Sequence, residues 1–134
     1  MRVEEIMAPL KVRVWPADTL RTVSQALREA RTGLAFVDGA GGGVFTERDL
    51  LVAIADGVDM DTTPVGEHMT PEPVVVSPDT PLGEACELMI ERGTRHLLVA
   101  GEDDVVGVVN MRDVVGVLSG AVSAAGQAPP ARGS

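Results

Sequence analysis

The sequence is poor in aromatic residues: it contains two phenylalanines, one tryptophan and no tyrosine among 134 residues. Its core must therefore be aliphatic, and it offers few rings on which single-stranded nucleic acid could stack. Basic residues are also scarce, because 11 lysines and arginines stand against 20 aspartates and glutamates, for a net charge of −9. This charge repels polyanions at long range, so nucleic acid is not an expected partner.

Cysteine and long apolar runs are lacking as well. One cysteine, Cys86, cannot form an internal disulfide, which is consistent with a reducing cytoplasm. No apolar stretch approaches the length that spans a bilayer, and the amino terminus lacks the pattern of a secretory signal. These features predict a cytoplasmic protein without a membrane segment.

What the sequence does contain is an internal repeat. Residues 43–49, Gly-Val-Phe-Thr-Glu-Arg-Asp, return as residues 107–113, Gly-Val-Val-Asn-Met-Arg-Asp, with four of the seven positions identical. The match extends over most of the chain, since the Met-x-Pro at Met7 recurs at Met69. Two extra residues in the second copy fall within 100–106, where a hairpin loop tolerates insertion. The chain is a tandem repeat of a unit of about sixty residues.

Each copy has the pattern of strand, helix, strand, strand and helix. Apolar residues recur at helical spacing from Leu20 and again from Leu82, and the apolar runs on either side predict strands. The predicted fold class is therefore α/β (α+β), with two β-α-β-β-α units. The predicted boundaries are 1–61 and 62–120, each with a lead-in segment, and a disordered tail at 121–134 that is rich in Ala, Gly and Pro.

These features together resemble a tandem pair of CBS domains, the cystathionine β-synthase domain, paired as a Bateman module. The resemblance covers about residues 1–120 and includes the Met-x-Pro lead-ins, the Asp-Thr before each first helix, the strand Arg95-His96-Leu97-Leu98-Val99 and both glycine-to-aspartate motifs. It implies a stand-alone regulatory pair with pseudo-two-fold symmetry, most commonly a homodimer. Such a pair would bind an adenosine-containing nucleotide in the cleft between its units and signal to a separate regulated protein. The implied ligands are AMP, ADP, ATP, S-adenosylmethionine and NAD.

The resemblance also implies roles for individual residues. The polar residue and the aspartate of each motif would hold ribose hydroxyls, basic residues would face the phosphates, and aliphatic residues of the first and second strands would surround the base. An ionised aspartate beside a hydroxyl or amide is suited to a cis-diol. The implied residues are Thr46, Asp49, Asn110 and Asp113 for the ribose, Arg95, His96, Arg48 and Arg112 for the phosphates, and Val12, Val14, Trp15 and Val76 for the base. The first copy has Gly33 and Leu34 where the second has Arg95 and His96, so the two sites are predicted to be unequal.

Several of these residues also have a purely structural interpretation. Thr46 and Asp49 have the spacing of a capping box, in which both side chains satisfy free amides at the start of a helix without any ligand. Trp15 could stack on a base or fill the cleft, and His96 suits a structural histidine as well as a phosphate contact. Cys86 falls on an apolar helix face and is assigned to the core. A ligand-free structural or dimerisation scaffold is therefore the alternative function.

No set of residues predicts catalysis. The sequence offers no nucleophile with a neighbouring base and no paired carboxylates in one site. Its two histidines, His68 and His96, are widely separated and do not form a metal-binding pattern. We therefore expect neither an enzyme nor a bound metal or cofactor.

Overall fold

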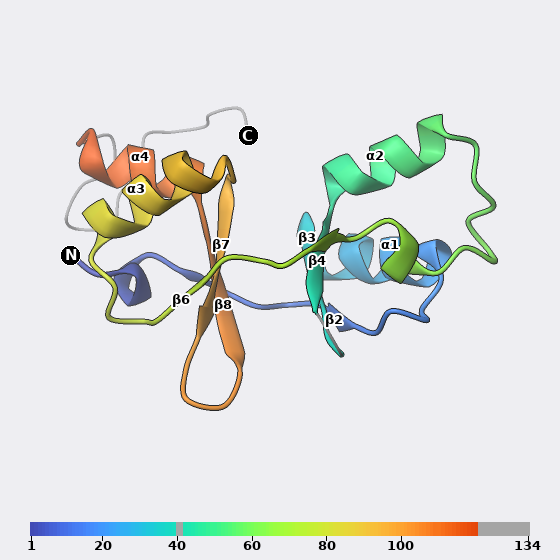
Figure 1. Ribbon diagram of the computed structural model, residues 1–134, viewed down its shortest axis with the longest axis horizontal. Coiled ribbons are helices and arrows are strands. Elements are labelled where there is room, and N and C mark those ends of the chain that lie inside the picture. Colours follow the sequence, from blue (N-terminus) through green and yellow to red (C-terminus); the bar gives the residue numbers. More distant parts are fainter. Residues whose placement is uncertain (40–41, 121–134) are drawn as a thin grey trace. The chain divides into compact units, whose positions relative to one another are not determined.

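The computed structural model describes residues 1–39 and 42–120, which form two compact units (Figure 1). The first-repeat unit contains Leu10–Pro73, and the second-repeat unit combines Met1–Pro9 with the described chain from Val74 to Gly120. The described residues contain four α-helices and two four-stranded sheets, so the predicted mixed class is confirmed. The segment 121–134, predicted to be disordered, lies outside the described residues.

In the first-repeat unit, the sheet has the strand order β2, β3, β4, β5. Its elements are β2 (Arg13–Val14), α1 (Leu20–Ala30), β3 (Leu34–Val37), β4 (Gly43–Thr46), α2 (Glu47–Ala55), the 3-10 helix η2 (Val65–Glu67) and β5 (Thr70–Pro71). β2 runs parallel to β3, which requires a crossover, and α1 is that crossover. The other neighbours pair antiparallel, and β4 continues directly into α2.

The second-repeat unit has the equivalent order β1, β8, β7, β6. Its elements are the 3-10 helix η1 (Val3–Glu5), β1 (Ala8–Pro9), β6 (Val75–Val76), α3 (Leu82–Arg92), β7 (His96–Ala100), β8 (Val105–Asn110) and α4 (Met111–Leu118). β6 runs parallel to β7 through α3, and β8 continues directly into α4. Both copies of the motif therefore form the predicted strand that leads into a helix.

Each sheet is completed by the lead-in segment of the other repeat. β1, from the start of the chain, pairs with β8, while β5 pairs with β4. In Figure 1 the blue amino-terminal segment accordingly belongs to the same unit as the yellow and orange elements. The compact units thus differ from the repeat boundaries 1–61 and 62–120, because each lead-in packs on the repeat to which it does not belong.

The glycine that opens each motif makes room for this lead-in. A Cβ atom at Gly43 would lie 2.7 Å from Met69 Sδ and 2.8 Å from the Thr70 carbonyl oxygen. A Cβ atom at Gly107 would similarly lie 2.8 Å from Met7 Sδ. In each unit, therefore, the motif glycine lies against the lead-in methionine. The absence of a side chain at the glycine allows the lead-in to approach the strand closely.

Each unit has its own aliphatic core. In the first-repeat unit the buried residues include Leu20, Val23, Leu27, Val37, Phe45 and Val65. In the second-repeat unit they include Val3, Leu82, Met89, Leu97, Val99 and Val114. Val65 and Val3 belong to the lead-ins and are fully buried, so burial of these side chains holds each lead-in in place. Cys86 is partly buried against the second core, as expected from its helix face.

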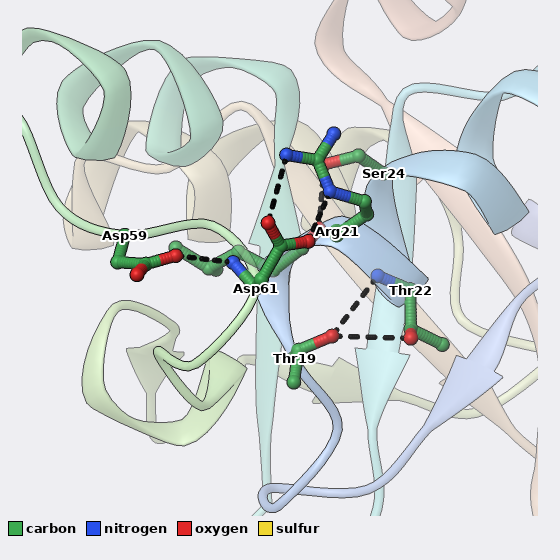
Figure 2. Close-up of polar contacts among 7 residues, drawn as sticks. Thr19, Arg21, Thr22, Ser24, Asp59 and Asp61 are labelled. Atoms are coloured by element: carbon green, nitrogen blue, oxygen red, sulfur yellow. Dashed lines mark hydrogen bonds and ion pairs between the residues drawn. The ribbon is translucent and has the colours of Figure 1, made fainter.

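The segment after α2 is attached to the start of α1 (Figure 2). Leu20 N donates to Thr63 O and Arg21 N donates to Met60 O, both at 2.9 Å, and the Arg21 guanidinium pairs with the Asp61 carboxylate. The hydrogen bond from Arg21 lowers the pKa of Asp61, and the same contact raises the pKa of Arg21. Both side chains are exposed, so this ion pair fixes the path of the segment and adds little to stability.

Candidate functional site

Thr46 and Asp49 form a complete capping box at the start of α2. Thr46 is the last residue of β4 and the N-cap of the helix, with extended backbone angles. Its Oγ1 accepts from Asp49 N at 3.3 Å, and its backbone N donates to Asp49 Oδ2 at 2.9 Å. Thr46 Oγ1 also lies 3.2 Å from Asp49 Oδ2, to which it donates. The structural role predicted for this pair is therefore present, and it holds the half-buried carboxylate in a defined orientation.

Asp49 has a further neighbour that the sequence did not indicate. Thr70 Oγ1, from β5, lies 3.3 Å from Asp49 Oδ1 and 3.5 Å from Asp49 Oδ2. These are long contacts, and an ionised carboxylate has about four acceptor positions, so Oδ1 can still accept from a ligand. The pairing of β4 with β5 sets Thr70 opposite Val44 and so brings it alongside the motif. Only that pairing could have identified Thr70, because it lies far from Asp49 in the sequence.

The second motif has a simpler arrangement. Asn110 is the N-cap of α4, and its Oδ1 accepts from Asp113 N at 3.1 Å. Asp113 is exposed, and within the described residues no hydrogen bond to its carboxylate is formed. The repeat position of Thr70 is occupied by Ala8, which has no hydroxyl. The two motifs are thus unequal in the way their aspartates are held.

The predicted phosphate residues of the second repeat lie beside its ribose residues. Antiparallel pairing of β7 with β8 sets His96 directly opposite Asn110, and the Arg95 carbonyl accepts from Met111 N at 2.8 Å. His96 is half-buried and Arg95 is exposed. One end of the β7–β8 pair therefore carries a cation and an imidazole next to the N-cap of α4.

The first repeat has the same strand pairing, but Gly33 and Leu34 stand where the second repeat has Arg95 and His96. Its register sets Leu34 opposite Thr46, and Gly33 O accepts from Glu47 N at 3.0 Å. The cation closest to Thr46 in sequence is Arg48, which is exposed in the first turn of α2. Arg112 is likewise exposed in the first turn of α4.

Three of the four predicted base-pocket residues belong to the cores of their units. Val12, Val14 and Val76 retain 9% or less of their surface. Trp15 is different, because it is 53% exposed and stands at the end of β2, where its backbone N donates to Asp18 Oδ2 at 2.8 Å. Among these four residues, Trp15 is the one whose side chain has free surface for a ligand.

Within residues 1–39 and 42–120, no group of three or more His, Cys, Asp or Glu side chains could hold a metal ion. Nor does any helix of this part have the length and apolar character needed to cross a membrane.

The family of the chain follows from its two matching halves. A protein-family model for the CBS domain matches the chain twice, at residues 3–56 and 65–120. The chain therefore belongs to the CBS domain family and contains a tandem pair of these domains, which confirms the resemblance predicted from the sequence.

Individual relatives show the same relationship. CBS domain-containing protein CBSCBSPB1 of Arabidopsis thaliana is 36% identical over 119 residues, which is 86% of this chain but 21% of that protein. CBS domain-containing protein YhcV of Bacillus subtilis is 30% identical over 115 residues, or 84% of this chain and 81% of YhcV. The solved structure of CBS domain protein PAE2072 from Pyrobaculum aerophilum, complexed with AMP, matches with a TM-score of 0.73 and 29% identity. That match covers 84% of this chain and 89% of PAE2072.

Proposed function

We propose that this chain is a regulatory module that binds an adenosine-containing nucleotide, with Thr46 and Asp49 at its ribose. The observation that carries the proposal is the fixed carboxylate of Asp49, which the Thr46 backbone holds at 2.9 Å while Oδ1 has only the long Thr70 contact. A carboxylate held in this way can accept from both hydroxyls of a ribose at little cost in side-chain entropy. The AMP complex of the similar protein PAE2072 supports this choice of ligand.

The second motif is proposed as a further ribose site of different affinity. Asn110 and Asp113 would contact the ribose, and Arg95 and His96 would face the phosphate, since strand pairing sets His96 opposite Asn110. Because Asp113 is exposed and lacks the bonds that fix Asp49, binding there would have to order the side chain. Its phosphate contacts would offset part of this cost.

Phosphate and base contacts at the first motif are assigned to its exposed side chains. Arg48 is the cation next to Thr46, and it stands in the first turn of α2, where the helix dipole also favours an anion. Trp15 offers a ring face for adenine, while Val12 and Val14 would contribute mainly through the backbone around β2. Val76 would have the corresponding role in the second repeat.

Among the ligands implied by the family, AMP is proposed first. The net charge of −9 repels every added phosphate, so affinity should decrease from AMP to ADP and ATP unless new cations contact the extra groups. S-adenosylmethionine and NAD are the further candidates. The ligand would regulate by binding two arrangements of the protein unequally, and a separate protein would respond to that change.

A homodimer is also part of the proposal. α2 and α4 expose large apolar side chains, with Leu51 at 66%, Ile54 at 55% and Leu118 at 54% of their surface. Exposed apolar groups of this kind are typical of surfaces that bind another protein. No catalytic step is proposed.

The test compares AMP with 2′-deoxy-AMP by isothermal titration calorimetry. Hydrogen bonds to a charged group contribute about 1.5–3 kcal/mol, so Asp49→Asn should weaken AMP binding about tenfold or more. The wild type should bind 2′-deoxy-AMP more weakly than AMP, and Asp49→Asn should remove most of that preference. Asp113→Asn tests the second motif in the same way, and Asp103→Asn, exposed in the β7–β8 loop, is the control.

Two results would contradict this function. Equal affinity for AMP and 2′-deoxy-AMP would show that Asp49 does not accept from the 2′-hydroxyl of the ribose. Absence of binding by every adenosine compound, with the chain folded and dimeric, would favour the ligand-free scaffold, in which Thr46 and Asp49 only cap α2.

A further inference from the structure

A groove of about 400 Å³ lies in the first-repeat unit between the end of α1 and the start of α2. This volume is within the range of small-molecule sites, about 300–1,000 Å³. Its polar lining residues are Ser24, Arg28, Arg31, Thr32 and Glu47. Thr46 and Asp49 do not line it, although Glu47 and Leu50 of α2, which adjoin these two residues, do.

Arg31 occupies an unfavourable backbone position in this groove. It is the C-cap of α1 and has left-handed angles, φ 55° and ψ 47°. A residue with a Cβ atom is strained in this region, and glycine is the usual choice at such a helix end. The equivalent C-cap of α3 is indeed a glycine, Gly93, with φ 63°. An arginine at this position therefore calls for a compensating role of its side chain.

The two guanidinium groups of the groove are not used by the fold. Arg28 and Arg31 are exposed, and within the described residues neither side chain forms an ion pair or a hydrogen bond. In the second repeat Ile90 replaces Arg28, Gly93 replaces Arg31 and Met111 replaces Glu47, while the position of Gly33 is taken by a cation, Arg95. The fold is built equally well without these charges, so the pair of arginines is a property of this groove and not of the unit.

The hydrogen-bonding groups of the groove fit an anion that also carries hydroxyls. Each of the two guanidiniums carries several N–H donors, which suit phosphate oxygens, and the Thr32 hydroxyl can donate as well. Ser24 already donates to Leu20 O at 2.7 Å and so can only accept. The Glu47 carboxylate lies against Gly33, where its oxygens can accept hydrogen bonds from donors of a ligand.

We propose that this groove binds a small organic phosphate with free hydroxyl groups, its phosphate between Arg28 and Arg31 and a hydroxyl on Glu47. The strained C-cap at Arg31, the two unpaired guanidiniums and the replacement of both arginines in the second repeat carry the inference together. Binding here does not require a nucleotide at Thr46 and Asp49.

Glycerol 3-phosphate is the probe, titrated into the full chain while amide NMR signals of Thr32 and Gly33 are followed. These signals should shift and saturate in the wild type. Arg31→Gly, which installs the residue of the second repeat, and Arg28→Gln should each weaken binding about tenfold or more. Arg31→Gly should keep or raise the melting temperature, because glycine relieves the backbone strain. Arg92→Gln, in the last turn of α3, is the control and should bind as the wild type does.

Asp49→Asn separates this proposal from the proposed function, since it should lose AMP affinity and retain glycerol 3-phosphate binding. The proposal is overturned if the wild type shows no saturable shift, or if the two arginine variants bind the probe as the wild type does. It is also overturned if Asp49→Asn removes probe binding, because the groove would then be part of the nucleotide site.

Discussion

A glycine-to-alanine substitution at Gly43 tests the contact that joins each lead-in to its motif. The added Cβ atom would lie 2.7 Å from Met69 Sδ and 2.8 Å from the Thr70 carbonyl oxygen. The methionine can move, but the carbonyl belongs to the backbone of β5, which pairs with β4 at Gly43 and Pro71. The strand must therefore shift, and overpacking of this kind costs about 1–3 kcal/mol. For a chain of this size, we expect the melting temperature to decrease by about 3–5 °C per kcal/mol.

The measurement is thermal and urea unfolding of Gly43→Ala beside Gly83→Ala. No atom lies within 4 Å of a Cβ at Gly83, an exposed position in α3, so alanine there should stabilise the chain by up to about 1 kcal/mol. In the Met69→Ala background, Gly43→Ala should lower the free energy of unfolding by a smaller amount. Some loss should remain, because the added Cβ atom still lies too close to the Thr70 carbonyl oxygen. Unchanged stability of Gly43→Ala would refute this account, as would an equal cost in both backgrounds.

Three further predictions concern the cap, the exchanged lead-in and acid stability. Thr46→Val removes the side-chain cap of α2 and should lower the free energy of unfolding by about 1 kcal/mol, whereas Thr46→Ser should retain it in urea titrations. Val3→Ala should destabilise the second core by roughly 1–3 kcal/mol and reduce amide-exchange protection in α3 but not in α1; the reverse pattern would contradict the exchange of lead-ins. The lowered pKa values of Asp61 and Asp79 mean that each contributes stability above its unfolded pKa near 3.8 and loses it as pH falls through the folded value. Between about pH 5 and pH 2, Asp61→Asn should therefore lose less stability than the wild type, by a small amount since Asp61 is exposed.

Much of the fold could be predicted because its signals are local. The helical spacing from Leu20 and from Leu82 identified α1 and α3, and the two motifs identified a strand continuing into a helix. The capping box of Thr46 and Asp49 was also predictable, because its partners stand three positions apart and meet whenever a helix starts there. The repeat then led from these elements to the CBS family.

The candidate site could be predicted only in part. The residues of each motif were evident from the repeat, but the position of Thr70 beside Asp49 was not. The groove of Arg28 and Arg31 was not evident either, since an arginine near a helix end is ordinary in a sequence and its left-handed backbone is not visible there.

The sequence alone establishes that there are two equivalent lead-ins, two motifs and two aliphatic β-α-β-β-α patterns. It did not determine which lead-in completes which sheet, because Met7 and Met69 occur in the same pattern and either could fit either glycine. The tertiary structure decided that Met7 contacts Gly107 and that Met69 contacts Gly43. The physical reason is that periodicity and capping depend on residues within one turn or one strand, whereas pairing between strands depends on where the connecting segments allow distant residues to meet.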